Sequence, residues 1–453
     1  MNPTATGTNV RVTPDKVHAT LAKHMLADGF DFVLDLDKSE GVWIWDSRGQ
    51  KRLMDFFSFF ASNPVGMNHP GVKTPEFTAR LAKAALHNVT NSDVYTTEMA
   101  EFVETFAAHA MGTHFKHAFF VAGGTLGIEN ALKAAFDWKV RRNFARGWRE
   151  ERGTQVLHFD QAFHGRSGYT LTLTNTTDPR KTAYFPKFDW PRVTNPKAEF
   201  PLNEDRLKDV KAREALAVAQ MERAFERYPD DIAAIILEPI QGEGGDNHFR
   251  PEFFRELRRI ADEKGAILVF DEVQAGYGLT GKFWAFEHYG VTPDMVAFGK
   301  KSQVCGFIST KRIDDVPENV FHVSSRINST WGGNLVDMVR CRRFLEIMEE
   351  ERLVENAATV GAHLRQGLEE LAAERPDALS NARGRGLMCA IDLADSALRD
   401  AALARAYELG MVILPCGKKS LRFRPPLDVT AADADEALDI LRRAVAQESA
   451  RSA

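Results

Sequence analysis

Cysteine is scarce in this sequence, and its four cysteines form no motif. They are scattered between positions 305 and 416 of 453 residues, with no Cys-x-x-Cys pair. This excludes a disulfide scaffold and a cysteine-based metal centre, and it is typical of the reduced thiols of a cytoplasmic protein. No other spacing of metal-ligating residues stands out, so we expect no metal.

Long apolar runs and an excess of positive charge are missing as well. No segment approaches the length of a membrane span, and residues 1–16 include no apolar stretch of the kind that export signals need. The formal net charge of −5 argues against nucleic acid or an anionic membrane as the main partner. The composition, 44% hydrophobic and 27% charged, indicates a soluble globular protein, which we expect in the cytoplasm.

Length and hydrophobic pattern predict an α/β fold with two domains. A chain of 453 residues is too long for one simple core. We expect residues 1–75 to contribute to a small domain, residues 76–340 to form a large domain, and residues 341–453 to complete the small one. In the middle region, short continuous β-branched and aromatic runs alternate with amphipathic segments. This pattern is typical of a mostly parallel sheet that helices cover on both faces.

Two local patterns predict further elements. The alternating runs of "WIWDSRGQKRLMDF", from residue 43, predict a β-hairpin around an Asp-Ser-Arg-Gly turn. Residues 340–374 are predicted to be a long helical stretch, which leads into short strands and a last helix.

Polar and glycine-rich segments follow the predicted strands of the large domain. Ligands of parallel α/β proteins gather beyond the carboxyl ends of the strands, so these segments define the candidate site. They are "AGGTLG" from residue 122, "FHGRSG" from 163, "EPIQGEGG" from 238, "DEVQ" from 271 and "GKK" from 299.

Gly124 and Thr125 open a predicted helix after the first of these strands. Their backbone N–H groups, the threonine hydroxyl and the helix dipole would suit a phosphate group. The segment is neither a Gly-x-Gly-x-x-Gly fingerprint nor a P-loop, so a dinucleotide is not indicated. Taken alone, a plain strand-to-helix turn explains it at least as well.

Three further residue types complete a possible cofactor site. Asp271 ends a buried strand, where a carboxylate needs a cationic partner such as the protonated ring nitrogen of a pyridoxal cofactor; a helix cap is the alternative. Phe163 would stack on such a ring or pack in the core. Lys300 and Lys301 end another strand, where a solvated cap is the common role of a lysine. Together with the phosphate turn, these residues predict a pyridoxal phosphate site.

The same segments resemble the class III aminotransferases, which are pyridoxal phosphate enzymes of fold type I. The resemblance covers most of the chain and is carried, in family order, by "GMNHPGV", "EPIQGEGG", "DEVQAGYGLTGKFWAFEHYGVTPDMVAFGKK" and "STWGGN". It implies a large domain with a mostly parallel sheet, a smaller α+β domain, aminotransferase activity, and a homodimer with active sites at the subunit interface.

The resemblance also implies roles for single residues. The family's catalytic, cofactor-binding lysine follows a Pro-Asp pair by one short strand, which matches Lys300 and makes Lys301 a surface neighbour. Asp271 matches the acid that pairs with the pyridine nitrogen. The other implied cofactor contacts are Gly124 and Thr125 at the phosphate, Phe163 on the ring with its neighbour His164, Gln274 near the ring hydroxyl, and Thr330 at the phosphate of the neighbouring subunit. The segment "GGTLGIE" lacks the acid that the family has at its phosphate turn, a departure that concerns Thr125.

Within the family, "GGTLGIENALKAAFDWK" and "AFHGRSGYTLTLTNT" are most similar to members that act on the ε-amine of L-lysine. Such a substrate keeps its α-carboxylate far from Lys300, and Arg166 would anchor it, since a guanidinium binds a carboxylate through two hydrogen bonds. The amino acceptor, 2-oxoglutarate, needs its α-carboxylate near the cofactor, where Arg422 matches the family position. Glu243 matches the acid that covers Arg422 while lysine is bound. Further expected substrate contacts are Asn328 and Glu238.

Other reactions remain open on the sequence alone. Ornithine δ-aminotransferase and 4-aminobutyrate aminotransferase are sister specificities, and a pyridoxal phosphate-dependent decarboxylase or racemase would use the same fold. A protein that only binds a ligand on this scaffold is the alternative from another class. Phe60 stands where ornithine-type relatives have a tyrosine, which would suit a longer methylene chain, but core packing explains it equally well.

Overall fold

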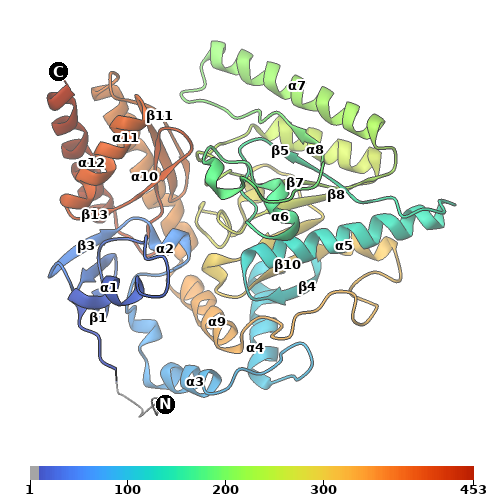
Figure 1. Cartoon of the computed structure of the whole chain (residues 1–453), viewed down its shortest axis with the longest axis horizontal. Coiled ribbons are helices and arrows are strands. Elements are labelled where there is room, and N and C mark those ends of the chain that lie inside the picture. The colour runs from blue at the N-terminus through green and yellow to red at the C-terminus, as the bar shows by residue number, and fades with distance from the viewer. Residues whose placement is uncertain (1–9, 453) are drawn as a thin grey trace, which may run out of the picture.

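The computed structural model describes residues 10–452, and Figure 1 shows the arrangement of its elements. The largest of three sheets has seven strands. In spatial order they are β4 (Phe115–Val121), β10 (Cys305–Thr310), β9 (Met295–Phe298), β8 (Ile267–Asp271), β7 (Ile232–Leu237), β5 (Gln155–Phe159) and β6 (Arg192–Val193). All neighbouring pairs are parallel except the two that β10 makes with β4 and β9.

Helices cover both faces of this sheet. On one face α5 (Gly124–Ala145) packs its Ile128, Leu132 and Trp138 against alternate strand residues such as Val156 and Ile236. The opposite face packs on α4 (Thr97–Phe106), α7 (Glu204–Arg227), α8 (Pro251–Lys264) and α9 (Leu335–Glu350). Burial of both faces explains the continuous apolar strands, and it confirms the predicted α/β fold with a mostly parallel sheet.

The second sheet joins the beginning of the chain to its end. Its order is β1 (Leu34–Glu40), β2 (Trp43–Asp46), β3 (Lys51–Asp55) and β13 (Met411–Val412). The predicted hairpin is confirmed, with Trp43 opposite Met54, and β13 then pairs in parallel with β3. The blue and red parts of the chain therefore lie together at one end of the molecule in Figure 1.

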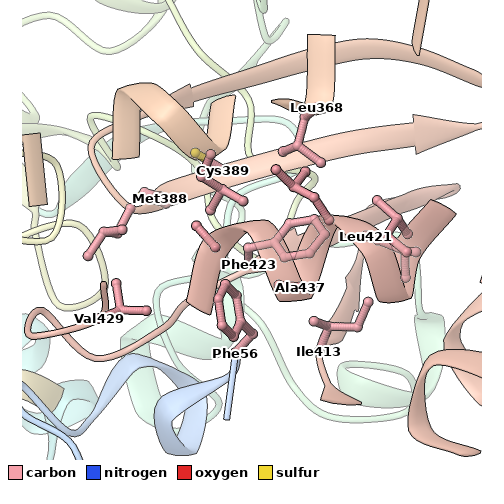
Figure 2. Close-up of a cluster of buried hydrophobic side chains, with 14 of the residues drawn as sticks. Phe56, Leu368, Met388, Cys389, Ile413, Leu421, Phe423, Val429 and Ala437 are labelled. Carbon is pink, nitrogen blue, oxygen red and sulfur yellow. The ribbon is translucent and has the colours of Figure 1, made fainter. Parts of the chain in front are cut away.

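The third sheet belongs entirely to the C-terminal part. It consists of β11 (Leu379–Arg385), β12 (Met388–Leu393), β15 (Ser420–Phe423) and β14 (Leu414–Cys416). It lies with α10 (Leu353–Glu374), α11 (Ser396–Glu408) and α12 (Ala431–Ser452). Figure 2 shows that Phe56, from the N-terminal segment, packs in the same apolar cluster as Phe423 and Ala437. The two ends of the chain thus share one core.

The long helical stretch predicted over residues 340–374 is confirmed, with one interruption that the sequence did not indicate. The structure has two helices, α9 and α10, separated at Arg352, whose φ of 53° is left-handed. Before the break the chain packs on α4 and on α3 (Pro75–Ala85), and after it on β11 and α12. The break allows α9 to pack against the large sheet and α10 to pack in the C-terminal core. The periodicity of apolar residues cannot predict it, because it depends on tertiary packing.

The remaining helices are short: α1 (Val17–Leu21), α2 (Ser58–Ala61) and α6 (Gly168–Leu173). Within residues 10–452, none of the helices is both long enough and apolar enough to span a bilayer. The first nine residues of the segment inspected for an export signal lie outside the described part.

Candidate active site

The carboxyl ends of β4, β5, β7, β8 and β9 meet at one cavity of about 450 Å³. It lies where parallel strands of α/β proteins hold their ligands. Of the residues predicted from the sequence, those that line it are Gly124, Thr125, Phe163, His164, Glu238, Glu243, Asp271, Gln274 and Lys300.

Asp271, the last residue of β8, is buried and held from two sides. Its Oδ2 lies 2.8 Å from Nδ1 of His164, and its Oδ1 accepts the backbone N–H of Val273 at 3.0 Å. Because a carboxylate only accepts, Nδ1 of His164 carries the proton. The arrangement fixes an acceptor at the cavity wall that suits a protonated ring nitrogen.

Lys300 begins a short 3₁₀ turn, η6 (Lys300–Ser302), directly after β9. Its φ of 56° is left-handed, a backbone strain that is common at functional sites. Burial lowers the pKa of Lys300 to about 8; Arg422 and Arg424 lower it further, whereas Asp271 and Glu238 oppose the shift. A larger fraction of the amine is therefore neutral, and nucleophilic, near neutral pH.

Lys301 is not the surface neighbour that the sequence suggested. It is only 2% exposed, and its Nζ donates to the carbonyl of Ala61 at 3.1 Å, away from the cavity lining. Burial lowers the pKa of Lys301 to about 7, and a nearby carboxylate, Asp55, partly offsets this. Lys300 is thus the lysine of the pair that faces the cavity.

The N-terminus of α5 forms another wall of the cavity. Gly123 has a φ of 109°, and Gly124 and Thr125 are the first residues of the helix. A Cβ at Gly124 would lie 3.0 Å from the Val273 side chain, so any larger residue would have to displace Val273 from the cavity wall. The free N–H groups of the first turn and the positive end of the dipole suit a phosphate. With Asp271 and Lys300, this wall fits pyridoxal phosphate.

Two arginines at the end of β15 contact residues of the cavity lining, although they do not line it themselves. Arg422, on β15, donates from Nη2 to Glu243 at 3.0 Å and from Nη1 to Oε1 of Gln274 at 3.3 Å. Arg424 donates to the same Gln274 oxygen at 3.2 and 3.3 Å and forms a buried ion pair with Asp246. Gln274 therefore orients both guanidinium groups and keeps its own amide N–H₂ for other partners.

Glu238 lies behind the phenylalanine of the site. Its two oxygens accept the backbone N–H groups of Phe163 at 2.9 Å and Gly242 at 3.1 Å. Burial, followed by the charge of Asp271, raises the pKa of Glu238 well above its usual range. Glu238 fixes the loop that carries Phe163.

Three predicted site residues lie elsewhere. Arg166, Asn328 and Thr330 are exposed and are not among the residues that line the cavity. Thr330 lies beside Ser92, whose hydroxyl donates to its carbonyl at 3.3 Å. Within one chain these residues do not complete the site.

Sequence reasoning missed several residues of the cavity wall. They are Ser62, Gly123, Gly165, Val273, Gln303 and Cys305. Gln303 and Cys305 follow the lysine pair within five residues, a signal that could have identified them. Ser62 offered none, because it reaches the site through a long-range hydrogen bond, from Gln303 Nε2 to the Ser62 carbonyl at 2.8 Å.

Known proteins resemble this chain over nearly its full length. The family model described as aminotransferase class-III matches residues 26–445. An L-lysine-epsilon aminotransferase of Mycobacterium tuberculosis is 53% identical over 434 residues, 96% of either chain. A mitochondrial 4-aminobutyrate aminotransferase of Homo sapiens is 32% identical over 425 residues, 88% of this chain and 82% of the relative. Among solved structures, a lysine aminotransferase from M. tuberculosis in the internal aldimine form has a TM-score of 0.94 at 52% identity, covering 96% of this chain and 99% of the other.

Proposed function

The chain belongs to the class III aminotransferases, which have fold type I and use pyridoxal 5′-phosphate, and on this premise we propose that it transfers the ε-amino group of L-lysine to 2-oxoglutarate. The products are 2-aminoadipate 6-semialdehyde, which cyclises to an imine, and L-glutamate. Identity of 53% to a lysine-epsilon enzyme, against 32% to a 4-aminobutyrate enzyme, favours lysine over that alternative.

The ion pair between Glu243 and Arg422 carries the proposal. An unpaired Arg422 beside Lys300 would attract the α-carboxylate of lysine and bring the α-amine to the cofactor. Glu243 covers this guanidinium, so the α-carboxylate stays remote and the ε-amine is presented. Each 1.4 kcal/mol of binding free energy changes the dissociation constant about tenfold. A difference of a few kcal/mol between the two binding modes of lysine therefore suffices for strong selectivity.

The residues around the cofactor hold protons at defined atoms. Bound pyridoxal phosphate supplies an aldehyde that captures amines and a ring that takes up electrons. Asp271, oriented by His164, would hold a proton on the ring nitrogen. Gly124 and Thr125 would hold the phosphate, and Phe163 would stack on the ring.

Lys300 would then act as the proton carrier. Its Nζ would remove a proton from the ε-carbon of lysine and pass it to the cofactor carbon that bears the amino group. In the second half it would take a proton back from that carbon and deliver it to the α-carbon that becomes part of glutamate. A pKa near 8 suits both directions, since the amine is neither fully protonated nor fully neutral around pH 8. Largely buried surroundings exclude competing water.

Substrate carboxylates would bind at two distances from Lys300. Arg422, once uncovered, would hold the α-carboxylate of 2-oxoglutarate close to the cofactor. We assign the remote α-carboxylate of lysine to Arg166, with Asn328 as a further contact. Both side chains are exposed in the single chain. For them to bind the substrate, the segments that carry Arg166 and Asn328 would have to move toward the cavity.

We also propose a homodimer with the sites at the interface. The exposed side chains Val94, Tyr95 and Trp331 lie near Thr330, since Asn91 bonds to the carbonyl of Trp331 at 3.1 Å. Such large apolar groups next to a predicted phosphate contact favour burial against a second copy. All four cysteines are buried free thiols, which supports a reducing compartment such as the cytoplasm.

Lysine labelled with ¹⁵N at the ε-position tests the function directly. The enzyme is incubated with this lysine and 2-oxoglutarate, and the glutamate formed is analysed. Labelled glutamate is the expected result. Unlabelled glutamate would mean transfer of the α-amine. It would contradict the proposed roles of Glu243 in covering Arg422 and of Arg166 in binding the α-carboxylate.

A substrate panel is the matching control. Ornithine and 4-aminobutyrate in place of lysine test the sister specificities, and release of carbon dioxide or loss of chirality from lysine tests a decarboxylase or racemase. We expect lysine to be the fastest amino donor, and a higher kcat/KM for either competitor would contradict the proposed substrate.

A further inference from the structure

Glu243 has a second cationic partner. One carboxylate oxygen accepts from Arg422, and the other forms an ion pair with Nζ of Lys181. Lys181 ends a short 3₁₀ turn, η4 (Pro179–Lys181), in the long connection before β6. About a fifth of each side chain, Lys181 and Glu243, is exposed, whereas Arg422 is buried. Glu243 thus bridges a buried and a more accessible cation.

The bridge separates two cavities. Glu243 lines both the active-site cavity and an outer cavity of about 790 Å³, whose wall includes Lys181. The Lys181 ammonium also lies 5.9 Å from the centre of the Phe163 ring. Lys181 therefore approaches the site from the outer side, with Glu243 between it and Arg422.

The two halves of the proposed reaction place different demands on Glu243. While lysine is bound, the carboxylate stays on Arg422. Before 2-oxoglutarate can reach Arg422, the carboxylate must leave that guanidinium, and a partly buried carboxylate without a cation is unfavourable. Lys181 is already in contact, so Glu243 can leave Arg422 without losing its only counter-charge.

We propose that Lys181 is a specificity residue of the ketoacid half-reaction. Its ammonium group holds the Glu243 carboxylate when Arg422 is released to bind the α-carboxylate of the acceptor. This rests on the proposed function, because it presumes that the acceptor binds Arg422. Without Lys181, Glu243 remains bound to Arg422 and competes with the incoming carboxylate. The lysine half-reaction, which needs no release, is unaffected.

Lys181→Met and Arg180→Met form a matched pair for the test. Arg180 is the preceding residue, but its guanidinium is exposed and paired with Asp178, not with Glu243. Glutarate, an unreactive dicarboxylate, is titrated into each holoenzyme by calorimetry, and the two half-reactions are timed separately. We expect Lys181→Met to weaken glutarate about fivefold and to raise the KM for 2-oxoglutarate, with the lysine half-reaction unchanged.

The outcomes separate the two proposals. Equal glutarate affinity in both variants would overturn the role of Lys181 alone. A wild-type holoenzyme that binds no glutarate and accepts no 2-oxoglutarate would overturn the acceptor site at Arg422 and the role of Lys181 with it. Restoration of the wild-type affinity by Lys181→Arg would support a charge-based role, and a loss equal to that of methionine would contradict it.

A separate observation concerns the amino-terminal end of β4, away from the catalytic cavity at the carboxyl ends of the strands. His117 of β4, Asp314 of η7 (Lys311–Asp315) and His322 place ligand atoms within 4.8 Å of one another. Nε2 of His117 is 2.8 Å from Oδ1 of Asp314, and Nε2 of His322 is 3.7 Å from the same oxygen. Because β10 runs antiparallel, its end and Asp314 lie away from the catalytic cavity.

Both imidazoles are already oriented. The Nδ1 atom of His322 lies 3.0 Å from the carbonyl of Pro317, which places its proton there and leaves the Nε2 lone pair facing Asp314. The ring of His117 stacks on Phe321 at 4.7 Å. Hydrogen bonds from the second ring nitrogen to a carbonyl orient histidine ligands in known metal sites.

We infer that these three residues form a surface site for a divalent cation of the zinc class. Two imidazoles and one carboxylate match zinc, and bonds of about 2.0–2.2 Å bring such ligand atoms to about 3–3.5 Å from one another. To reach that geometry His322 would move slightly toward Asp314, whereas His117 would release its Nε2 proton to solvent and move slightly away from the same oxygen. Lys116, 3.8 Å from Asp314, would have to turn away, which its exposed side chain permits.

Zinc titration of the holoenzyme against a chromophoric chelator tests the site. We expect one zinc per chain in the wild type, lost in His322→Ala and retained in His363→Ala. His363 is a matched control, because it pairs with Asp435 at 2.6 Å but belongs to no group of three ligands among the described residues. Equal binding by both variants, or no binding by the wild type, would overturn the inference.

Discussion

Lys300 and Lys301 are neighbours in sequence, but their ammonium groups lie in different surroundings. A 3₁₀ turn rotates successive side chains by about 120°, so one lysine faces the cavity and the other faces Ala61. Sequence reasoning selected Lys300 through its spacing from a Pro-Asp pair. It could not find the surroundings of Lys301, because Ala61 is 240 residues away.

Replacing Lys300 with alanine tests its chemical role. We expect transamination to fall by about 10⁴-fold, since both cofactor capture and proton transfer are lost. Absorbance should show that pyridoxal phosphate still binds without a covalent link, because the phosphate wall remains. Substantial turnover by the variant would assign the chemistry to another residue.

His158 makes the fold sensitive to acid. It is fully buried in β5, and burial, with the nearby positive charge of Arg192, lowers its pKa to about 3. The unfolded value is about 6.5, so the stabilisation is complete above pH 6.5 and is lost as the pH falls toward 3. At pH 5 the loss from this residue is about 2 kcal/mol.

Urea unfolding at pH 7.5 and pH 5 measures this contribution. In His158→Leu the fall in unfolding free energy between the two pH values should be about 2 kcal/mol smaller than in the wild type. His24→Asn, at an exposed position, should leave the fall unchanged. The same fall in all three proteins would show that His158 is not the group that titrates.

At the scale of elements, α2 is a left-handed turn. Ser58, Phe59, Phe60 and Ala61 all have positive φ, which costs about 1–2 kcal/mol per residue. Asp55 offsets part of this cost by accepting the N–H groups of Phe57 and Ser58, and the lysine segment bonds to the carbonyls of Ala61 and Ser62. The Phe60 ring is half exposed as a result.

Lys301→Met should loosen this turn. Removing the buried ammonium, which donates to the Ala61 carbonyl at 3.1 Å and has the Asp55 carboxyl nearby, should lower the unfolding free energy by about 1–3 kcal/mol. Because Ser62 lines the cavity, the KM for lysine should rise, while cofactor capture by Lys300 persists. Lys311→Met, at an exposed position, is the control for both measurements. An equal effect in that variant would contradict the proposed role of Lys301 in holding the turn at residues 58–61.

Element boundaries were predictable where local pattern decides them. The hairpin around the Asp-Ser-Arg-Gly turn and the buried parallel strands followed from periodicity. Strand β10, Cys305–Thr310, was missed because its six residues adjoin the lysine turn and carry no turn signal of their own. The break at Arg352 was missed because two packing layers, not the local sequence, require it.

At the scale of the whole molecule, the chain is expected to act as a dimer. Tyr95 and Trp331 are 77% and 42% exposed, an unusual state for side chains of this size. Tyr95→Glu with Trp331→Glu should give monomers in analytical ultracentrifugation and weaken cofactor binding at least about tenfold, because Thr330 no longer reaches a neighbouring phosphate. Leu216→Glu, at an exposed position of α7, should remain dimeric. Dimeric behaviour of the double variant would place the interface elsewhere.

Periodicity predicted the α/β class, and the convergence of strand ends in a parallel sheet predicted the segments that line the cavity. The family resemblance then selected several of the nine cavity residues named above within those segments, including His164, Gln274 and Glu243. The sequence did not predict that the N-terminal hairpin and the C-terminal part share a sheet through β3 and β13, since no local signal specifies which strands pair. The proposed boundaries at residues 75 and 340 remain a prediction. The roles of Arg166, Asn328 and Thr330 remain predictions, because all three are exposed and do not line the cavity of the single chain.

The position of β10 also sets an order for biosynthesis. Within the large sheet, β4 pairs with β10 and with no other described strand, although residues 122–304 separate the two in the chain. In a nascent chain that ends before Cys305, β4 therefore has no partner strand within the described part, and β9 lacks its partner on one side. The large sheet is complete only after β10 has been inserted between β4 and β9. A stalled chain exposes these aggregation-prone strand edges until synthesis resumes, and a truncated product exposes them permanently.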